Sequence, residues 1–176
     1  NAEDTNTTNS LTSYNSDGFT LGTGSNGNYT GTGGTTHVGW CWKAGGNSNT
    51  YNIDDIGYAT ASAAGLDVGS ITPTGASVNT EAGFSIIKYT GNGSTASISH
   101  GLNSTPECVI VKNLDTAGTS WAVWHDGYGD NNYQTLYLDA TSNLATLNRT
   151  RISAVSNQTL SLANHFEVTG NADEHI

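Results

Sequence analysis

Charged residues are scarce in this chain, and basic ones most of all. Only 11% of its 176 residues are charged, and five Lys or Arg stand against 15 Asp or Glu, for a formal net charge of −10. A nucleic-acid-binding protein needs a basic surface that neutralises phosphates. An anionic membrane surface would repel the same excess of carboxylates. We therefore expect no nucleic acid among the partners.

Long apolar runs and methionine are also missing. No stretch reaches the roughly 18 consecutive apolar residues of a membrane-spanning helix, so we expect no membrane insertion. No signal peptide is visible. Because the chain has no Met and opens on Asn1, we expect a processed product or part of a longer polypeptide.

Cysteine is limited to Cys41 and Cys108, each inside a strand-like run. Three interpretations are open. The thiols could be small buried apolar groups, or they could form a disulfide between neighbouring strands. A metal site is disfavoured, because two thiols without CxxC spacing make a poor ligand set.

Residues that favour turns and short strands are abundant. The chain has 22 Gly, and Ser, Thr and Asn are frequent, while hydrophobic residues make up 35%. This composition is typical of many short strands joined by polar turns. We predict an all-β fold, an antiparallel β-sandwich of jelly-roll-like type. It would have long Gly/Asn/Thr-rich loops and an extended N-terminal arm over residues 1–10.

The stretch 83–114 gives the clearest strand pattern. GFSIIKYT is apolar and β-branched, and TASISH alternates, with Ala96, Ile98 and His100 on one face. CVIVKNL is apolar without a break, as is typical of a strand buried on both faces. We expect these three strands to form the centre of the sandwich. His100, beside Gly101, is interpreted as a structural histidine that holds a turn.

Two segments before this centre are harder to interpret. TTHVGWCWKAGG predicts a strand with Trp40 and Trp42 on one face, either as core or as a stacking platform for a sugar or partner. Residues 47–80 predict a long ordered excursion, a kind of loop that is often functional or shared between chains. The predicted organisation has three parts: residues 1–46 as an arm and the closing strands of a preceding unit, 47–82 as the excursion, and 83–176 as the main sandwich.

The segment TSWAVWHDGYGDNNYQTLYLDA predicts a hairpin with a polar, aromatic loop. Exposed rings beside carboxylates could bind a ligand such as a glycan. Oxygen ligands on the same loop could bind Ca²⁺, although the pattern is not an EF-hand; no other cofactor is expected. The metal ligands would include Asp126 and Asp130. The candidate ligand-binding residues are Trp124, Asp126, Tyr128, Asp130, Asn131 and Tyr133.

Motifs for catalysis are missing. His125–Asp126 is the sharpest pair, but no GxSxG nucleophile turn and no HExxH helix accompany it. Nothing in the sequence places two carboxylates across a cleft. We therefore predict that the protein is not an enzyme.

One internal similarity links the two ends of the chain. LTSYNSDGFTLGTG near the start resembles ISAVSNQTLSLANHFEVTG near the end. Both are interpreted as a strand, a polar turn, a Phe-led strand and a Gly-rich exit. Two copies are a weak repeat signal. The chain would then carry the closing strands of one unit followed by most of a second.

The phrases LTSYNSDGFTLGTG, THVGWCWKAGG, SHGLNSTPECVIVKNLD and WAVWHDG, in this order, resemble an uncharacterised domain of large structural proteins of marine bacteriophages, including cyanophages. The resemblance covers residues 11–139. It implies a virion-surface role as tail fibre, receptor-binding appendage or capsid decoration, and no catalytic residues. After Asp139 the sequence departs from this pattern, so we expect the last strand to be missing, disordered or supplied by another subunit. A motif similar to one in phage tail-fibre domains is formed by His100, Gly101, Leu102, Pro106, Val109, Ile110 and Val111.

Together these observations predict a non-enzymatic structural module on the virion surface or outside the cell. It would assemble with copies of itself and other virion proteins through exchange of strands and loops. The alternatives are a carbohydrate- or receptor-binding module of a phage adhesin, which would contact host surface glycans, and a filament or adhesin subunit of non-viral origin.

Overall fold

The computed structural model describes residues 11–22, 39–128, 135–139 and 150–176. The chain divides into two compact units, with the boundary between Trp42 and Lys43. The segments 47–82 and 83–176, which the sequence interpretation kept apart, fall in the same larger unit.

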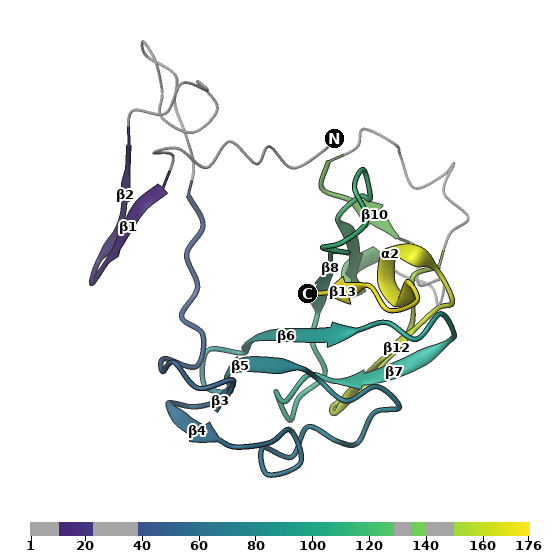
Figure 1. Ribbon diagram of the computed structural model, residues 1–176, viewed down its shortest axis with the longest axis horizontal. Helices are drawn as coiled ribbons and strands as arrows, with labels where there is room; N and C mark the ends of the chain where they lie inside the picture. The colour runs from purple at the N-terminus through teal and green to yellow at the C-terminus, as the bar shows by residue number, and fades with distance from the viewer. Residues whose placement is uncertain (1–10, 23–38, 129–134, 140–149) are drawn as a thin grey trace. The chain divides into compact units, whose positions relative to one another are not determined.

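The larger unit contains a five-stranded sheet in the order β13-β6-β5-β3-β4 (Figure 1). Three of its strands come from the segment interpreted as an irregular excursion: β3 (Tyr51–Ile53), β4 (Ile56–Tyr58) and β5 (Gly75–Asn79). That interpretation was wrong, because short strands of three to five residues leave little alternation to detect. The pairing of β3 with β5 is parallel, and β3 pairs antiparallel with β4 across the two-residue turn Asp54–Asp55.

Two further sheets of three strands belong to the same unit. One has the order β10-β9-β8 and contains the predicted hairpin, with β9 (Ala122–His125) paired to β10 (Leu136–Tyr137). The other has the order β11-β12-β7 and is built from β11 (Ile152–Val155) and β12 (Thr159–Leu162). All pairings within these two sheets are antiparallel.

The stretch 83–114 supplies one strand to each of the three sheets. These strands are β6 (Phe84–Thr90), β7 (Ala96–Ser99) and β8 (Cys108–Val111). The stretch is therefore central, as expected, but β8 is not buried on both faces. Val109 and Val111 are buried, whereas Cys108 and Ile110 are exposed.

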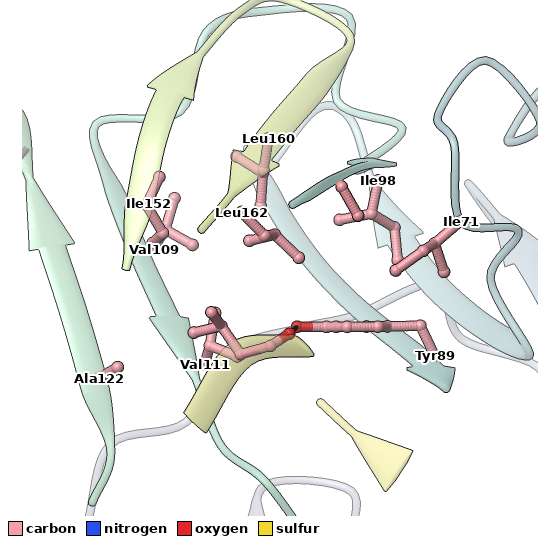
Figure 2. Packing of buried hydrophobic residues seen from close by; sticks show 11 residues of the cluster. Ile71, Tyr89, Ile98, Val109, Val111, Ala122, Ile152, Leu160 and Leu162 are labelled. Atoms are coloured by element: carbon pink, nitrogen blue, oxygen red, sulfur yellow. Dashed lines mark hydrogen bonds between the residues drawn. The ribbon is translucent and has the colours of Figure 1, made fainter. Parts of the chain in front are cut away.

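The main hydrophobic core is formed by strands of all three sheets (Figure 2). Ile98 of β7 and Leu162 of β12 point toward the ring of Tyr89, which comes from β6. Val109, Val111 and Ala122 bring β8 and β9 into the same cluster. A smaller core includes Leu66, Ala76, Val78 and Leu102, and Ile87 of β6 packs against both clusters.

The C-terminal residues are tied into this unit. HFEVTG was expected to be a strand, but residues Phe166–Thr169 form the one-turn helix α2. His165 caps it, accepting a hydrogen bond from the Glu167 amide at 3.2 Å, and this local bond explains the difference. The chain then forms β13 (Glu174–His175), which pairs with β6 of the same chain.

The smaller unit contains the hairpin of β1 (Leu11–Asn15) and β2 (Gly18–Leu21). Residues 39–42, expected to continue a strand, lie outside any strand. Trp40 and Trp42 are exposed, so their interpretation as core was wrong. A single hairpin offers too little apolar surface to bury a pair of indoles.

The described residues confirm the all-β fold class with several antiparallel sheets and one short α-helix. The jelly-roll order stays a prediction. The expected arm over residues 1–10 lies outside the described residues.

Candidate functional site

The candidate ligand-binding residues begin at the end of β9. His125 ends the strand, and Asp126–Tyr128 form the 3-10 turn η1. The Asp126 amide donates to the Glu107 carbonyl at 3.0 Å, which ties this turn to the residue before β8. Three of the predicted site residues, Asp130, Asn131 and Tyr133, lie outside the described residues.

Trp124 does not project freely from this site. Its side chain is half-buried and packs against the main core, and its strand partner is Val109. Its immediate role is therefore packing, which weakens its use as a flat stacking surface for a sugar. Asp126, two residues further along the chain, is exposed.

Cys108, His125 and Asp126 come together at the paired ends of β8 and β9. Cys108 and His125 are strand partners, and His125 Nδ1 lies 3.2 Å from Asp126 Oδ1. A cysteine nucleophile requires a thiolate. Here partial burial and then the negative charge of Asp126 raise the pKa of the Cys108 thiol. The group holds its proton at neutral pH, so this triplet does not form an activated nucleophile.

Both cysteines carry free, exposed thiols. The interpretation of Cys41 and Cys108 as buried apolar residues was therefore wrong, because Cys41 lies outside any strand and Cys108 faces outward on β8. The disulfide between them stays a prediction, since they belong to different units.

The described residues contain no group of three or more His, Cys, Asp or Glu side chains that could hold a metal ion. Asp126 therefore belongs to no such group among them, and the proposed partner Asp130 lies outside the described residues. Ca²⁺ binding by this loop stays a prediction.

A hollow at the β3–β4 turn gathers further polar groups. Asp54 and Asp55 both have positive φ, as a two-residue hairpin turn requires. Asp54 accepts hydrogen bonds from the Thr80 hydroxyl at 2.6 Å and the Thr80 amide at 2.7 Å. These bonds lower the pKa of Asp54. Lys43, Gly45 and Glu81 also line the hollow, and the Asp55 carboxylate lies 3.7 Å from Lys43 Nζ.

His100 is a structural histidine, as interpreted from the sequence. It is buried, its Nε2 lies 3.1 Å from the Ser156 carbonyl oxygen, and its Nδ1 accepts from the Leu102 amide at 3.2 Å. These contacts suit the neutral ring with the proton on Nε2. Burial lowers the pKa of His100.

Sequence reasoning missed a buried ion pair between Arg151, the residue before β11, and Glu167 of α2. Arg151 and Glu167 are both buried, and Arg151 Nε donates to Glu167 Oε2. The Tyr137 hydroxyl donates to the same carboxylate oxygen at 3.1 Å and accepts from Arg151 Nη2 at 3.2 Å. The scarcity of basic residues was the signal that could have found this pair, because Arg151 is one of only five Lys or Arg in the chain.

A second buried polar group holds the C-terminus. The Asn113 side chain donates to the Phe166 carbonyl at 2.7 Å and to Asp173 Oδ2 at 2.8 Å. The bond from Asn113 and then one from the Thr116 hydroxyl at 2.8 Å lower the pKa of Asp173. His175 stacks on Tyr89 with ring centroids 5.1 Å apart. The Arg151–Glu167 pair and the Asn113–Asp173 pair are both used to hold together segments that are distant in sequence.

The surface that stands out instead lies on the smaller unit. Phe19 and Leu21 of β2 are 39% and 43% exposed, and Tyr14 of β1 is more exposed still. Phe19 and Tyr14 are strand partners, so this apolar side is continuous across both strands. We call Tyr14, Phe19 and Leu21 the hairpin face.

Comparison with known proteins adds a family. The family model described as "Domain of unknown function (DUF7483)" matches residues 1–176. The chain belongs to this family. Membership in the DUF7483 family covers both units of the chain. Among curated proteins and among solved structures, no match is found. No helix of the described residues is both long and apolar enough to cross a membrane.

Proposed function

We propose that the chain is a non-enzymatic structural module of a phage particle, part of a tail fibre, an appendage or the capsid surface. It assembles through strands and loops exchanged between copies and with other virion proteins. The observation that carries the assembly part is the hairpin face, whose three side chains stay exposed although Gly39 lies against the Phe19 ring.

An uncovered hairpin needs a partner for physical reasons. A two-stranded hairpin is marginally stable in water, and a third strand or a packed layer stabilises it. Apolar side chains contribute about 25 cal/mol for each Å² removed from water, so covering Phe19 and Leu21 favours association. In the described residues, β1 and β2 each pair only with the other, which leaves backbone groups on both edges for a new strand.

A second open edge supports the same proposal. β4 ends the five-stranded sheet, and Ile56 on it is exposed. The segment that carries β4 is the one for which the sequence suggested sharing between chains. Edge strands in natural proteins are often protected by charge. β4 has the sequence IGY and carries none.

The phage setting is supported by the sequence phrases within residues 11–139. Mass spectrometry of purified particles from the source would test it, with peptides of this chain expected among the virion proteins. Their recovery from extracellular filaments of a cell without phage would favour the non-viral adhesin instead.

Assembly is tested by sedimentation velocity over a range of concentrations. The full chain is expected to form larger species as concentration rises, and Phe19→Ser/Leu21→Ser is expected to reduce them. A matched control is Ile110→Ser/Leu114→Ser, whose side chains are 44% and 42% exposed on the larger unit. Equal loss of association in both variants, or a monomer at every concentration, would contradict the proposal.

A further inference from the structure

The N-terminal hairpin repeats the β11–β12 hairpin of the larger unit residue by residue. Three of the four paired positions of β1–β2 have their counterpart 141 residues further on, from Leu11 and Ile152 to Leu21 and Leu162. The β1–β2 hairpin has a two-residue turn, whereas three residues separate β11 from β12, where the Ser156 amide donates to the Thr159 carbonyl at 2.9 Å. Both hairpins shift register at one place, between Leu11 and Ser13 and between Ile152 and Ala154.

The side chains at the bulge repeat as well. The Thr12 hydroxyl donates to the Thr20 carbonyl at 3.1 Å, and the Ser153 hydroxyl donates to the Ser161 carbonyl at 3.3 Å. A bulge at a fixed position with the same hydrogen bond is a specific feature of a strand pair. This alignment also corrects the sequence interpretation, since the strand of Phe19 corresponds to β12 and not to the segment of Phe166.

The two hairpins differ in what covers them. Leu160 and Leu162 are 9% and 0% exposed, because they lie in the main core and β12 pairs with β7. Their counterparts Phe19 and Leu21 are 39% and 43% exposed. Among the described residues, the same local structure is thus present twice, once with a partner strand and core and once without.

We propose that β1–β2 is the closing hairpin of another unit with the fold of residues 43–176, one whose β7-type strand is not already covered by a hairpin of its own. There β2 pairs antiparallel with that strand, and Phe19 and Leu21 enter that unit's core where Leu160 and Leu162 lie here. This inference rests on the proposed assembly function and names its partner. Between two copies of this chain, the same pairing requires that β1–β2 take the place of the β11–β12 hairpin on β7, which is the strand exchange proposed above. The expected strand partners, by analogy with β12, are Gly18 with Ser99, Phe19 with Ile98, Thr20 with Ser97 and Leu21 with Ala96 of the other unit.

A hairpin transplant in the full chain tests the fit. Residues 152–162 are replaced by LTSYNSDGFTL, the sequence of residues 11–21. The control receives TSYNSDGFTLG, residues 12–22, which turns Phe and Leu to the opposite face of the strand. The in-register chimera is expected to unfold cooperatively with a melting temperature lowered by about 10 °C or less, and the shifted control to lose cooperative unfolding.

Phe in place of Leu160 could overfill the core, so a second chimera keeps Leu at that position. If both in-register chimeras behave like the shifted control, the proposal is overturned and the hairpin face has a different partner.

A disulfide experiment in the chimera tests the register. Cysteines are placed at positions 99 and 159, and the native thiols are removed by Cys41→Ser and Cys108→Ser. The Ser99 hydroxyl has no hydrogen-bond partner among the described residues, so Cys at this position removes no hydrogen bond. A disulfide in the chimera supports the register, and a folded chimera without one overturns it.

This experiment measures folding of a single chain. Chimeras that fold while the natural chain stays monomeric would keep the closing-hairpin assignment and remove self-assembly. Chimeras that fail to fold while the natural chain associates through Phe19 and Leu21 would keep self-assembly and remove the closing-hairpin assignment.

Discussion

At the scale of single residues, the protein uses its few charged groups inside as well as outside. Lys112 and Arg151 are buried among only five Lys or Arg residues. A buried ion pair contributes little net stability, but a lone buried charge is costly. The Arg151–Glu167 pair therefore makes a specific contact between the start of β11 and α2, and loss of either partner is expected to be destabilising.

We expect Glu167→Gln to lower the free energy of unfolding by about 3–5 kcal/mol, because Arg151 would keep its buried charge without a counter-ion. Urea denaturation measures it. The control Glu174→Gln breaks the exposed Lys88–Glu174 pair, with its 2.7 Å Nζ–Oε1 distance, and should cost about 1 kcal/mol or less. Equal losses in the two variants would refute the role of burial. Arg151→Met/Glu167→Leu should recover part of the loss.

The buried His100 predicts a pH dependence. Its pKa is lowered from 6.5 in the folded state, so the unfolded chain binds the proton more tightly. The stabilisation is fully present above about pH 6.5 and is lost as pH falls from there toward the folded pKa. His100→Asn should flatten this part of the stability profile in urea titrations. Ser99→Ala, at the neighbouring buried position, should keep the wild-type slope, and an unchanged slope in His100→Asn would contradict this account.

At the scale of elements, close backbone contacts fix the C-terminal segment against the end of β6. A Cβ at Gly91 would overlap the Gly170 carbonyl oxygen and lie 2.7 Å from the Thr169 carbonyl carbon. The Gly91 amide also donates to the Asp173 carbonyl at 2.8 Å. Glycine at this position therefore lets α2 and β13 approach the sheet.

Gly91→Ala is expected to cost about 1–3 kcal/mol in urea denaturation, because the two segments must separate. It should also speed hydrogen exchange of the Ile176 amide, which donates to the Lys112 carbonyl. Gly75→Ala on β5 is the control, since the nearest atom to its Cβ would lie 3.5 Å away. A cost no larger than that of Gly75→Ala would show that the contact is not tight.

Elements with a clear period were predictable from the sequence, and those set by tertiary contacts were not. GFSIIKYT and TASISH gave their strands because apolar or alternating residues recur over several positions. β3 and β4 span three residues each, too few for a period, and α2 is defined by the cap of His165. The site residues on the β9–β10 loop were chosen for their chemistry, whereas Trp124 is held by packing that no local pattern reveals.

At the scale of the whole molecule, stability is expected to reside in the larger unit. Both hydrophobic clusters are built from residues between Tyr51 and Val168. The hairpin face contributes to neither. We therefore expect the smaller unit to be stabilised by a partner from outside the chain.

Removal of residues 1–42 should therefore leave the main thermal transition of the chain within about 3 °C of the full-length value. Removal of residues 151–176 should abolish it, because Ile152, Leu160, Leu162 and Val168 are lost from the main core. Differential scanning calorimetry compares the three chains. A large fall in melting temperature on removing residues 1–42 would show that the hairpin stabilises its own larger unit.

The central claim is that the hairpin face is uncovered in the single chain and covered on assembly. Amide hydrogen exchange at Phe19, Thr20 and Leu21, followed as a function of protein concentration, tests it most directly. We predict fast exchange in the dilute chain and strong protection once larger species form, while Ile98 stays protected throughout. Protection of the three amides in the dilute monomer, or none in the assembled state, would contradict the account.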